Sequence, residues 1–274
     1  MILTQALDFN AESDLLHDLL KDRDNSDFDR VTLFRNWSVN DVLGHLHMWN
    51  HAADLSATNE AGFREFLSAF GAAGAQHFPY THEWSGGLKG QALLDAWREL
   101  YSDMARRWQS FDPEKRVKWA GPDMSVQMSI VARHMETWAH GQEVFDLFGV
   151  RRQDEDRIRN IVDLGVRTFG WTFANRQIDR PPIKPFVELT APSGATWRWN
   201  DESDRDYIKG AATDFCQVVT QTRSVADVAL DIAGVSARQW MAIAQCFAGP
   251  PVDPPAPGMR FCAPPTSDST AGSC

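Results

Sequence analysis

Four polar side chains recur at helical spacing in the stretch ARHMETWAHGQEVFD: Arg133, Glu136, His140 and Glu143. On a helical wheel at ~100° per residue they form one narrow stripe, and nearly all the rest of the circle is apolar. Such a stripe is either a solvent-facing surface with an Arg133–Glu136 ion pair or, on a buried helix, the wall of an internal pocket. In the second case Glu136 and His140, at positions i and i+4, can reach one metal ion. The geometry of the helix alone leaves both interpretations open.

A third ligand would have to come from another helix, and NWSVNDVLGHLHMWNHAADL offers three histidines. The apolar centre of this helix lies near Val42 and Leu46. His45 and His47 flank that centre on opposite sides at similar angles, so periodicity does not choose between them. His51 points away from the centre and is expected to be solvated.

The elements that would position these residues are mostly helices. Ser38 and Asp41 make an S-x-x-D capping box, which predicts the start of the histidine-bearing helix. The stretch QHFPYTHEWSGG is expected to be a loop. Apolar periodicity predicts further helices over residues 8–24, 60–70, 90–111, 125–149 and 154–176.

The composition changes after about residue 180. FVELTAPSGATWRWN predicts two strands around a Pro-Ser-Gly turn, DFCQVVTQTR a strand or short helix, and SARQWMAIAQCFAG a closing helix. The fold class is therefore α plus α+β. We expect a four-helix bundle (1–150), a helical connector (151–179), a small α+β domain (180–249) and a disordered Pro-rich tail (250–274).

Composition excludes several classes of function. A net charge of −10 argues against nucleic acid and anionic membrane as partners, because both require clustered basic residues. No apolar run approaches the ~18 residues of a spanning helix, and the N-terminus does not have the pattern of a secretory signal. The four cysteines lie far apart, which argues against a disulfide framework or a thiolate zinc site and favours the cytoplasm. Cys216 and Cys246 lie in apolar runs and are expected to be packing residues.

NWSVNDVLGHL resembles the N-terminal signature of the mycothiol-dependent maleylpyruvate isomerase family, a branch of the DinB-like metal-binding four-helix bundles. In that signature a ligand histidine follows a tryptophan by eight residues, which here gives Trp37 and His45. A Glu-x3-His on the last bundle helix is matched by Glu136 and His140. The resemblance thus implies His45, Glu136 and His140 as metal ligands.

The run WAGPDMSVQMSIVARHMETWAHGQEV is more specifically similar to a subfamily of actinobacterial metal-binding proteins of undefined function, whose second domain is sterol-carrier-like. The stretches GAATDFCQVVTQTR and AGVSARQWMAIAQCFAGPP fit it too, so the resemblance covers most of residues 10–251. Glu143 stands where the subfamily usually has Asp. The isomerase commonly ends its second domain with Gly-Arg, whose Arg serves the substrate carboxylate, but here the end is Gly249-Pro250. This departure argues against maleylpyruvate as the substrate. Arg223 and Arg238 are candidates to replace the missing arginine as the group that binds a substrate carboxylate.

Three protein ligands would leave open positions on a divalent ion, which is the catalytic pattern. The donor set suits Zn²⁺, with Ni²⁺, Co²⁺ or Mn²⁺ able to bind, and the resemblance implies mycothiol as a thiol cofactor. Arg133 and Glu143 are candidate catalytic groups that orient the ligands, or else an ion pair framing the helix. We therefore expect a cytoplasmic isomerase or thiol S-transferase acting on a small-molecule substrate, as a monomer or homodimer. The alternatives are thiol-independent Lewis-acid chemistry on a secondary metabolite, and a non-catalytic carrier of an apolar ligand with a structural metal.

Overall fold

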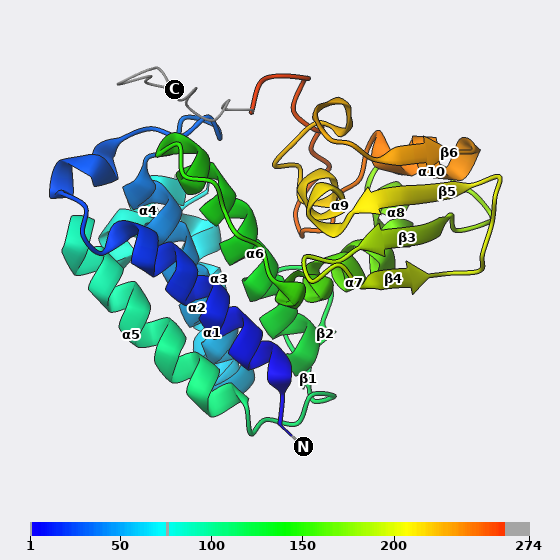
Figure 1. Ribbon diagram of the computed structural model, residues 1–274. Coiled ribbons are helices and arrows are strands. Elements are labelled where there is room, and N and C mark those ends of the chain that lie inside the picture. Colours follow the sequence, from blue (N-terminus) through cyan, green and yellow to red (C-terminus); the bar gives the residue numbers. More distant parts are fainter. Residues whose placement is uncertain (1, 75–76, 261–274) are drawn as a thin grey trace, which may run out of the picture. The chain divides into compact units, whose positions relative to one another are not determined.

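The computed structural model describes residues 2–74 and 77–260 (Figure 1). The chain forms two compact units, Met1–Leu147 and Phe148–Cys274. The first unit is helical apart from a two-stranded ribbon, and the second combines a four-stranded sheet with short helices. The predicted class, α plus α+β, is confirmed.

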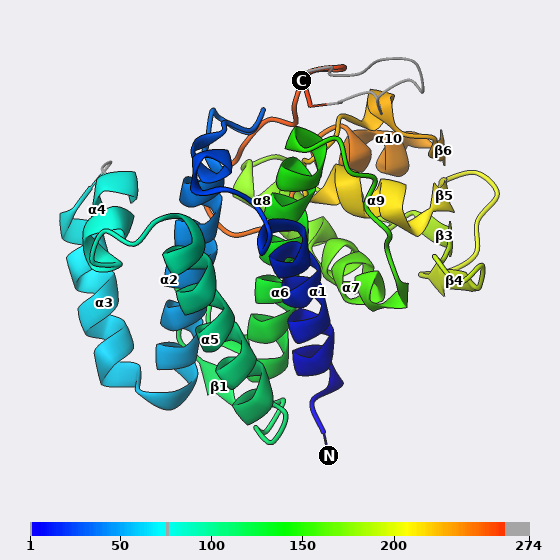
Figure 2. The ribbon, with the colours of Figure 1, turned by 60° about the vertical axis from the view of Figure 1, so that its left-hand side comes forward.

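The first unit is a bundle of four long helices, in which α1 packs against α5 and α6, and α2 packs against the same two helices (Figure 2). Short elements connect them: a 3-10 turn, helices α3 and α4, and the antiparallel ribbon β1–β2. The bounds are α1 Thr4–Leu20, η1 Asn25–Asp29, α2 Val39–Thr58, α3 Glu60–Ala72, α4 His77–Trp84, α5 Gly90–Trp108, β1 Arg116–Val117, β2 Met124–Ser125 and α6 Val126–Leu147.

Polar contacts fix the long helices against one another at particular points. The carboxylate of Asp54 on α2 accepts hydrogen bonds from Arg107 Nη2 and Trp108 Nε1 of α5, each at 2.9 Å. The Tyr101 hydroxyl of α5 donates to Asp14 Oδ1 of α1 at 2.7 Å. Because these bonds are partly buried, they set the axial position of α2 and α5 as well as their packing.

The stretch predicted as a loop contains α4, so that prediction is wrong. Pro79 lies in the first turn of this helix, where a proline removes no intrahelical hydrogen bond. Tyr80 and Trp84 pack against a cluster built on Phe63 and Phe66 of α3. Tertiary packing of these aromatic rings therefore stabilises a short helix whose own sequence has weak apolar periodicity.

In the second unit the sheet order is β4-β3-β5-β6, with β3 antiparallel to β4 and parallel to β5, and β5 antiparallel to β6. The β3–β4 pair is the hairpin predicted around the Pro-Ser-Gly turn. The bounds are η2 Asp156–Ile158, α7 Arg159–Arg167, α8 Phe169–Asn175, β3 Phe186–Thr190, β4 Thr196–Trp199, β5 Tyr207–Ala211, α9 Ala212–Val219, η3 Val225–Asp227, β6 Asp231–Ala233 and α10 Val235–Met241.

The core of the second unit forms around Trp240 of α10, which contacts Phe169 of α8 and Phe215 of α9 edge-on. The helix predicted over 154–176 is divided into α7 and α8 at Thr168, whose backbone (φ −85°, ψ 7°) leaves the helical region. DFCQVVTQTR contains helix α9, the second of the two alternatives. The closing helix α10 ends at Met241, earlier than its sequence indicates.

Part of the segment expected to be a disordered tail, residues 250–260, is hydrogen-bonded within the second unit. Gln221 Nε2 donates to the carbonyl oxygen of Val252 at 2.9 Å, and Val252 N donates to Gln245 Oε1 at 3.0 Å. These buried side-chain amides form hydrogen bonds with the backbone of a proline-rich segment that has no regular secondary structure. The rest of the expected tail, residues 261–274, lies outside the described residues.

None of the helices in the described part of the chain combines the length and the apolar character that crossing a bilayer requires.

Candidate metal centre

Helix α2 begins where the sequence predicts. Ser38 Oγ accepts a hydrogen bond from Asp41 N at 3.1 Å, and Ser38 N donates to Asp41 Oδ2 at 2.8 Å, so the capping box is complete. A capping box satisfies two backbone N–H groups, here those of Ser38 and Asp41, and fixes the first turn of the helix. His45 lies in the second turn, and its position therefore depends directly on the cap.

The polar stripe of α6 is buried. Arg133 and Glu143 are 2% and 3% exposed, and His140 is 9% exposed. The Glu136 side chain is 24% exposed, the most of the four. The stripe is therefore not a solvent-facing surface, and the first of the two interpretations of ARHMETWAHGQEVFD is wrong. A buried stripe of this kind requires polar partners or a ligand.

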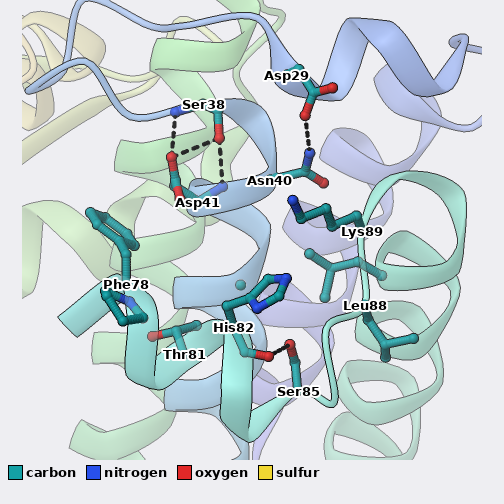
Figure 3. Close-up of a pocket in the computed structure, with 13 residues that line it drawn as sticks. Asp29, Ser38, Asn40, Asp41, Phe78, Thr81, His82, Ser85, Leu88 and Lys89 are labelled. Carbon is teal, nitrogen blue, oxygen red and sulfur yellow. Dashed lines mark hydrogen bonds between the residues drawn. The ribbon is translucent and has the colours of Figure 1, made fainter. Parts of the chain in front are cut away.

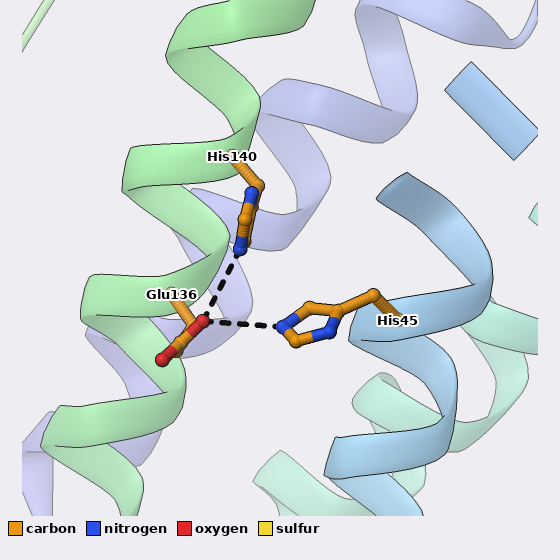
Figure 4. A group of neighbouring side chains, drawn as sticks. All are labelled: His45, Glu136 and His140. Atoms are coloured by element: carbon orange, nitrogen blue, oxygen red, sulfur yellow. Dashed lines mark hydrogen bonds and ion pairs between the residues drawn. The ribbon is translucent and has the colours of Figure 1, made fainter. Parts of the chain in front are cut away.

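Three of the predicted residues meet at one carboxylate oxygen (Figure 4). Glu136 Oε2 of α6 lies 3.3 Å from His140 Nε2 on the same helix and 3.3 Å from His45 Nε2 of α2. One donor atom from each side chain can be chosen so that all lie within 4.8 Å of one another. Two imidazoles and a carboxylate at this separation can hold one divalent cation.

The protonation states of these groups suit a cation. Burial lowers the pKa of His45 to about 4, so its imidazole is neutral near pH 7. Burial would raise the pKa of Glu136, but hydrogen bonds from His140 and His45 and the charge of Arg133 outweigh it and hold the pKa well below the usual range. A neutral imidazole and an ionised carboxylate are the forms in which these side chains bind metals.

Aromatic rings surround the two histidines. The ring of His140 is stacked on Trp37 at 5.2 Å between centroids and meets Phe34 edge-on at 5.1 Å. Trp37 also contacts His45 at 5.3 Å. Sequence reasoning identified Trp37 only through the family signature and missed Phe34. These contacts restrict rotation of both imidazoles and keep water away from them.

Arg133 lies beside this group. Its Nη2 is 3.8 Å from Glu136 Oε2, and its guanidinium carbon is 6.0 Å from the centroid of Trp119. Glu143 is buried two helical turns beyond Glu136 and is not one of the three converging donors. The structure therefore brings Arg133 to His45, Glu136 and His140, which we call the triad, and Glu143 lies farther along the same helix.

The other histidines of α2 have different surroundings. His47 contacts Trp84 at 5.2 Å, and burial lowers its pKa to about 4. His51 lies between Trp84 and Phe66, at 5.2 and 6.3 Å, and is half-buried, so it is less solvated than expected. The aromatic residues of α3 and α4 that cover this side of α2 could not be assigned to it from periodicity.

A separate pocket of about 350 Å³ opens beside the start of α2 (Figure 3). Asn40 Nδ2 donates to Asp29 Oδ1 at 2.9 Å, and Asn40 Oδ1 accepts from Gly90 N at 2.8 Å. None of the three converging donors lines it. Phe78 borders the pocket and packs against Trp37 at 4.7 Å, so Trp37 stands between the pocket and His140.

The candidates in the second unit are less suited to chemistry. Cys216 and Cys246 are buried, and burial raises the pKa of Cys216, as expected of packing residues. Arg223 is buried and donates to the carbonyl oxygen of Thr222 at 2.9 Å, whereas Arg238 is exposed. Cys262 and Cys274 lie outside the described residues.

Residues 9–145 match the family model of the mycothiol maleylpyruvate isomerase N-terminal domain. Uncharacterized proteins from Mycobacterium tuberculosis strains CDC 1551 / Oshkosh and H37Rv are 36% identical over 245 residues, which is 89% of this chain and 95% of each relative. The crystal structure of the mycothiol-dependent maleylpyruvate isomerase is similar at a TM-score of 0.51 and 16% identity, covering 80% of this chain and 88% of that one. A histidine-to-alanine mutant of that enzyme gives the same TM-score at 15% identity.

Proposed function

Because the chain belongs to the family of the mycothiol maleylpyruvate isomerase N-terminal domain, we propose that it is a divalent-metal-dependent enzyme that uses a low-molecular-weight thiol. The thiol is of the mycothiol kind, and the reaction is isomerisation of, or transfer of the thiol to, a small electrophilic substrate. The compartment is the cytoplasm, where such thiols are kept reduced. The observation that carries the proposal is the convergence of His45, Glu136 and His140 from two helices.

These three residues are the proposed metal ligands. Within the described residues, no fourth His, Cys, Asp or Glu joins the group, so a bound cation would keep positions for water, thiol or substrate. Zn²⁺ fits two imidazoles and one carboxylate, and Co²⁺, Ni²⁺ or Mn²⁺ could replace it. A divalent cation held here would lower the pKa of an entering thiol and so favour the nucleophilic thiolate.

The remaining residues of the site bind and orient. Trp37 and Phe34 hold the imidazole of His140 in a fixed plane, and together with the low exposure of the His45 side chain they limit the access of water. A water-poor site raises the reactivity of a thiolate toward an electrophilic carbon, because the anion loses solvation. Arg133, 3.8 Å from Glu136 Oε2, offsets the negative charge of this carboxylate and is a candidate for orienting it.

Cobalt substitution tests the proposal directly. The Co²⁺-loaded protein is titrated with mycothiol and, as a control, with its S-methyl derivative, while the near-ultraviolet absorption is recorded. We expect a saturable sulfur-to-cobalt charge-transfer band with the thiol and none with the thioether. A protein that binds cobalt but gives no band with the thiol would favour thiol-independent Lewis-acid chemistry. A spectrum that changes neither with thiol nor with cyanide would favour the carrier with a structural metal.

A further inference from the structure

The guanidinium of Arg133 is buried, but two of its nitrogen atoms have no hydrogen-bond acceptor among the described residues. Its side chain is 3% exposed, and neither Nε nor Nη2 has a hydrogen-bond partner among the described residues. Its ion pair with Glu136 is 3.8 Å long and joins Nη2 to an oxygen that two histidines already approach. A buried arginine with unused donors destabilises the folded protein, unless a ligand supplies the missing acceptors.

A metal ion at the triad would increase the need of Arg133 for another acceptor. Arg133 forms an ion pair with Oε2 of Glu136, and the proposed function assigns that carboxylate to the cation. The cation, Glu136 and Arg133 together carry a net charge of about +2 when both histidines are neutral. One thiolate would remove one of these charges. The other is left for a second anionic group that reaches the guanidinium.

Glu143 does not neutralise this charge. It stands ten residues beyond Arg133 on the same helix, which at ~1.5 Å per residue places the two backbones ~15 Å apart. That distance exceeds the reach of an Arg–Glu ion pair. The excess positive charge therefore stays beside the triad.

Aromatic rings connect the triad to Arg133. Trp49 lies 6.5 Å from His45 and 5.6 Å from Trp119, between ring centroids. Trp119 in turn faces Arg133 and is stacked on Phe63 at 5.9 Å with an interplanar angle of 8°. These rings give the triad and the adjacent Arg133 a flat, apolar border.

We infer that Arg133 binds a carboxylate of the substrate, and that Trp49 and Trp119 pack against the flat, unsaturated carbon skeleton that carries it. The inference rests on the proposed function, since it takes the electrophile to lie at the triad. Arginine suits the task because its donors form a planar fork that matches the two oxygens of a carboxylate. Arg133 is then a residue of substrate binding, and the sequence motif around it encodes both metal and substrate recognition.

Crotonate and crotonamide form a matched pair of probes, because they share a flat unsaturated skeleton and differ in charge. Calorimetry measures the binding of each to the zinc-loaded protein and to zinc-loaded Arg133→Gln, Arg133→Lys and Arg64→Gln. Arg64 is exposed on α3 and pairs with Glu60, so its variant controls for loss of a positive charge. Zinc content and the cobalt–thiol band are recorded for every variant.

We expect crotonate to bind the wild type at least tenfold more tightly than crotonamide. Arg133→Gln should lose about tenfold or more in crotonate affinity, Arg133→Lys should lose less, and Arg64→Gln should match the wild type. Zinc content should be equal in all. Equal affinity of Arg133→Gln and wild type for crotonate, or equal binding of the two probes, would overturn the inference. Absence of the cobalt–thiol band while crotonate binding still depends on Arg133 would contradict the proposed function and leave the anion site standing.

Discussion

The imidazole of His140 is stacked on the indole of Trp37, with ring centroids 5.2 Å apart and planes inclined by 13°. Trp37 precedes the capping residue of α2, and His140 lies on α6, so the contact joins the start of one helix to the middle of another. The same indole contacts His45. Trp37 thus orients both proposed imidazole ligands.

Replacing Trp37 with alanine should weaken metal binding. Loss of the stacked ring frees both imidazoles to rotate, and groups that orient metal ligands typically affect affinity by about 10- to 100-fold. We expect zinc affinity, measured by competition with a chromophoric chelator, to fall at least tenfold. The matched control is Trp84→Ala, which removes a ring from His47 and His51 on the same helix and should leave zinc affinity within about twofold of the wild type. Equal losses in the two variants would argue against a specific role for Trp37.

Removing the side-chain cap of α2 should destabilise the fold. Ser38→Ala removes the hydroxyl that accepts from Asp41 N and donates to Asp41 Oδ2, and loss of a side-chain cap of this kind costs about 1 kcal/mol. Urea denaturation of the metal-free protein should show this loss, while Ser110→Ala, at an exposed serine after α5, should change stability by less than about 0.5 kcal/mol. An unchanged midpoint for Ser38→Ala would show that the cap contributes nothing to stability.

The metal-free protein should lose stability as the pH falls from about 6.5 to about 4. The unfolded chain binds a proton at His47 near pH 6.5, whereas burial lowers the pKa of His47 in the folded protein to about 4. Unfolding therefore takes up a proton in this window, and acidification favours the unfolded state by up to roughly 3 kcal/mol for this residue. His45 adds a loss with the same sign, because its pKa is also lowered to about 4.

Substitution of His47 isolates its share. Urea denaturation of metal-free His47→Gln at pH 7, 5.5 and 4.5 should give a shallower fall in stability than the wild type, because the glutamine does not titrate. His82→Gln, at an exposed histidine of α4, is the control and should follow the wild-type curve. Parallel curves for His47→Gln and wild type would contradict the assignment.

Much of the bundle was predictable from local patterns. The capping box of Ser38 and Asp41 located the start of α2, and long apolar periodicities located α2, α5 and α6, because each keeps a helical repeat over several turns. Helix α4 was not predictable, since its stability comes from aromatic rings on α3. The division at Thr168 was missed for a similar reason: tertiary packing overrides a periodicity that is continuous in sequence.

The candidate site was predictable only in part. Spacing placed Glu136 and His140 on one face, but periodicity gave His45 and His47 equal standing, because both flank the same apolar stripe. The family signature favoured His45, and the structure brings His45 to Glu136 while His47 packs on Trp84. Trp119 precedes β2 and Arg133 lies on α6, and no local sequence pattern predicts that these two residues come close to each other.

The central claim is that His45, Glu136 and His140 hold a catalytic metal ion, and metal content after purification and zinc loading measures it most directly. We predict one zinc per chain for the wild type and for His47→Ala, whose histidine lies two residues from His45 on the same helix. We predict less than a tenth of that for His45→Ala, Glu136→Gln and His140→Ala, with circular dichroism to establish that each variant is folded. Stoichiometric zinc in folded His45→Ala, or its loss in folded His47→Ala, would contradict the account.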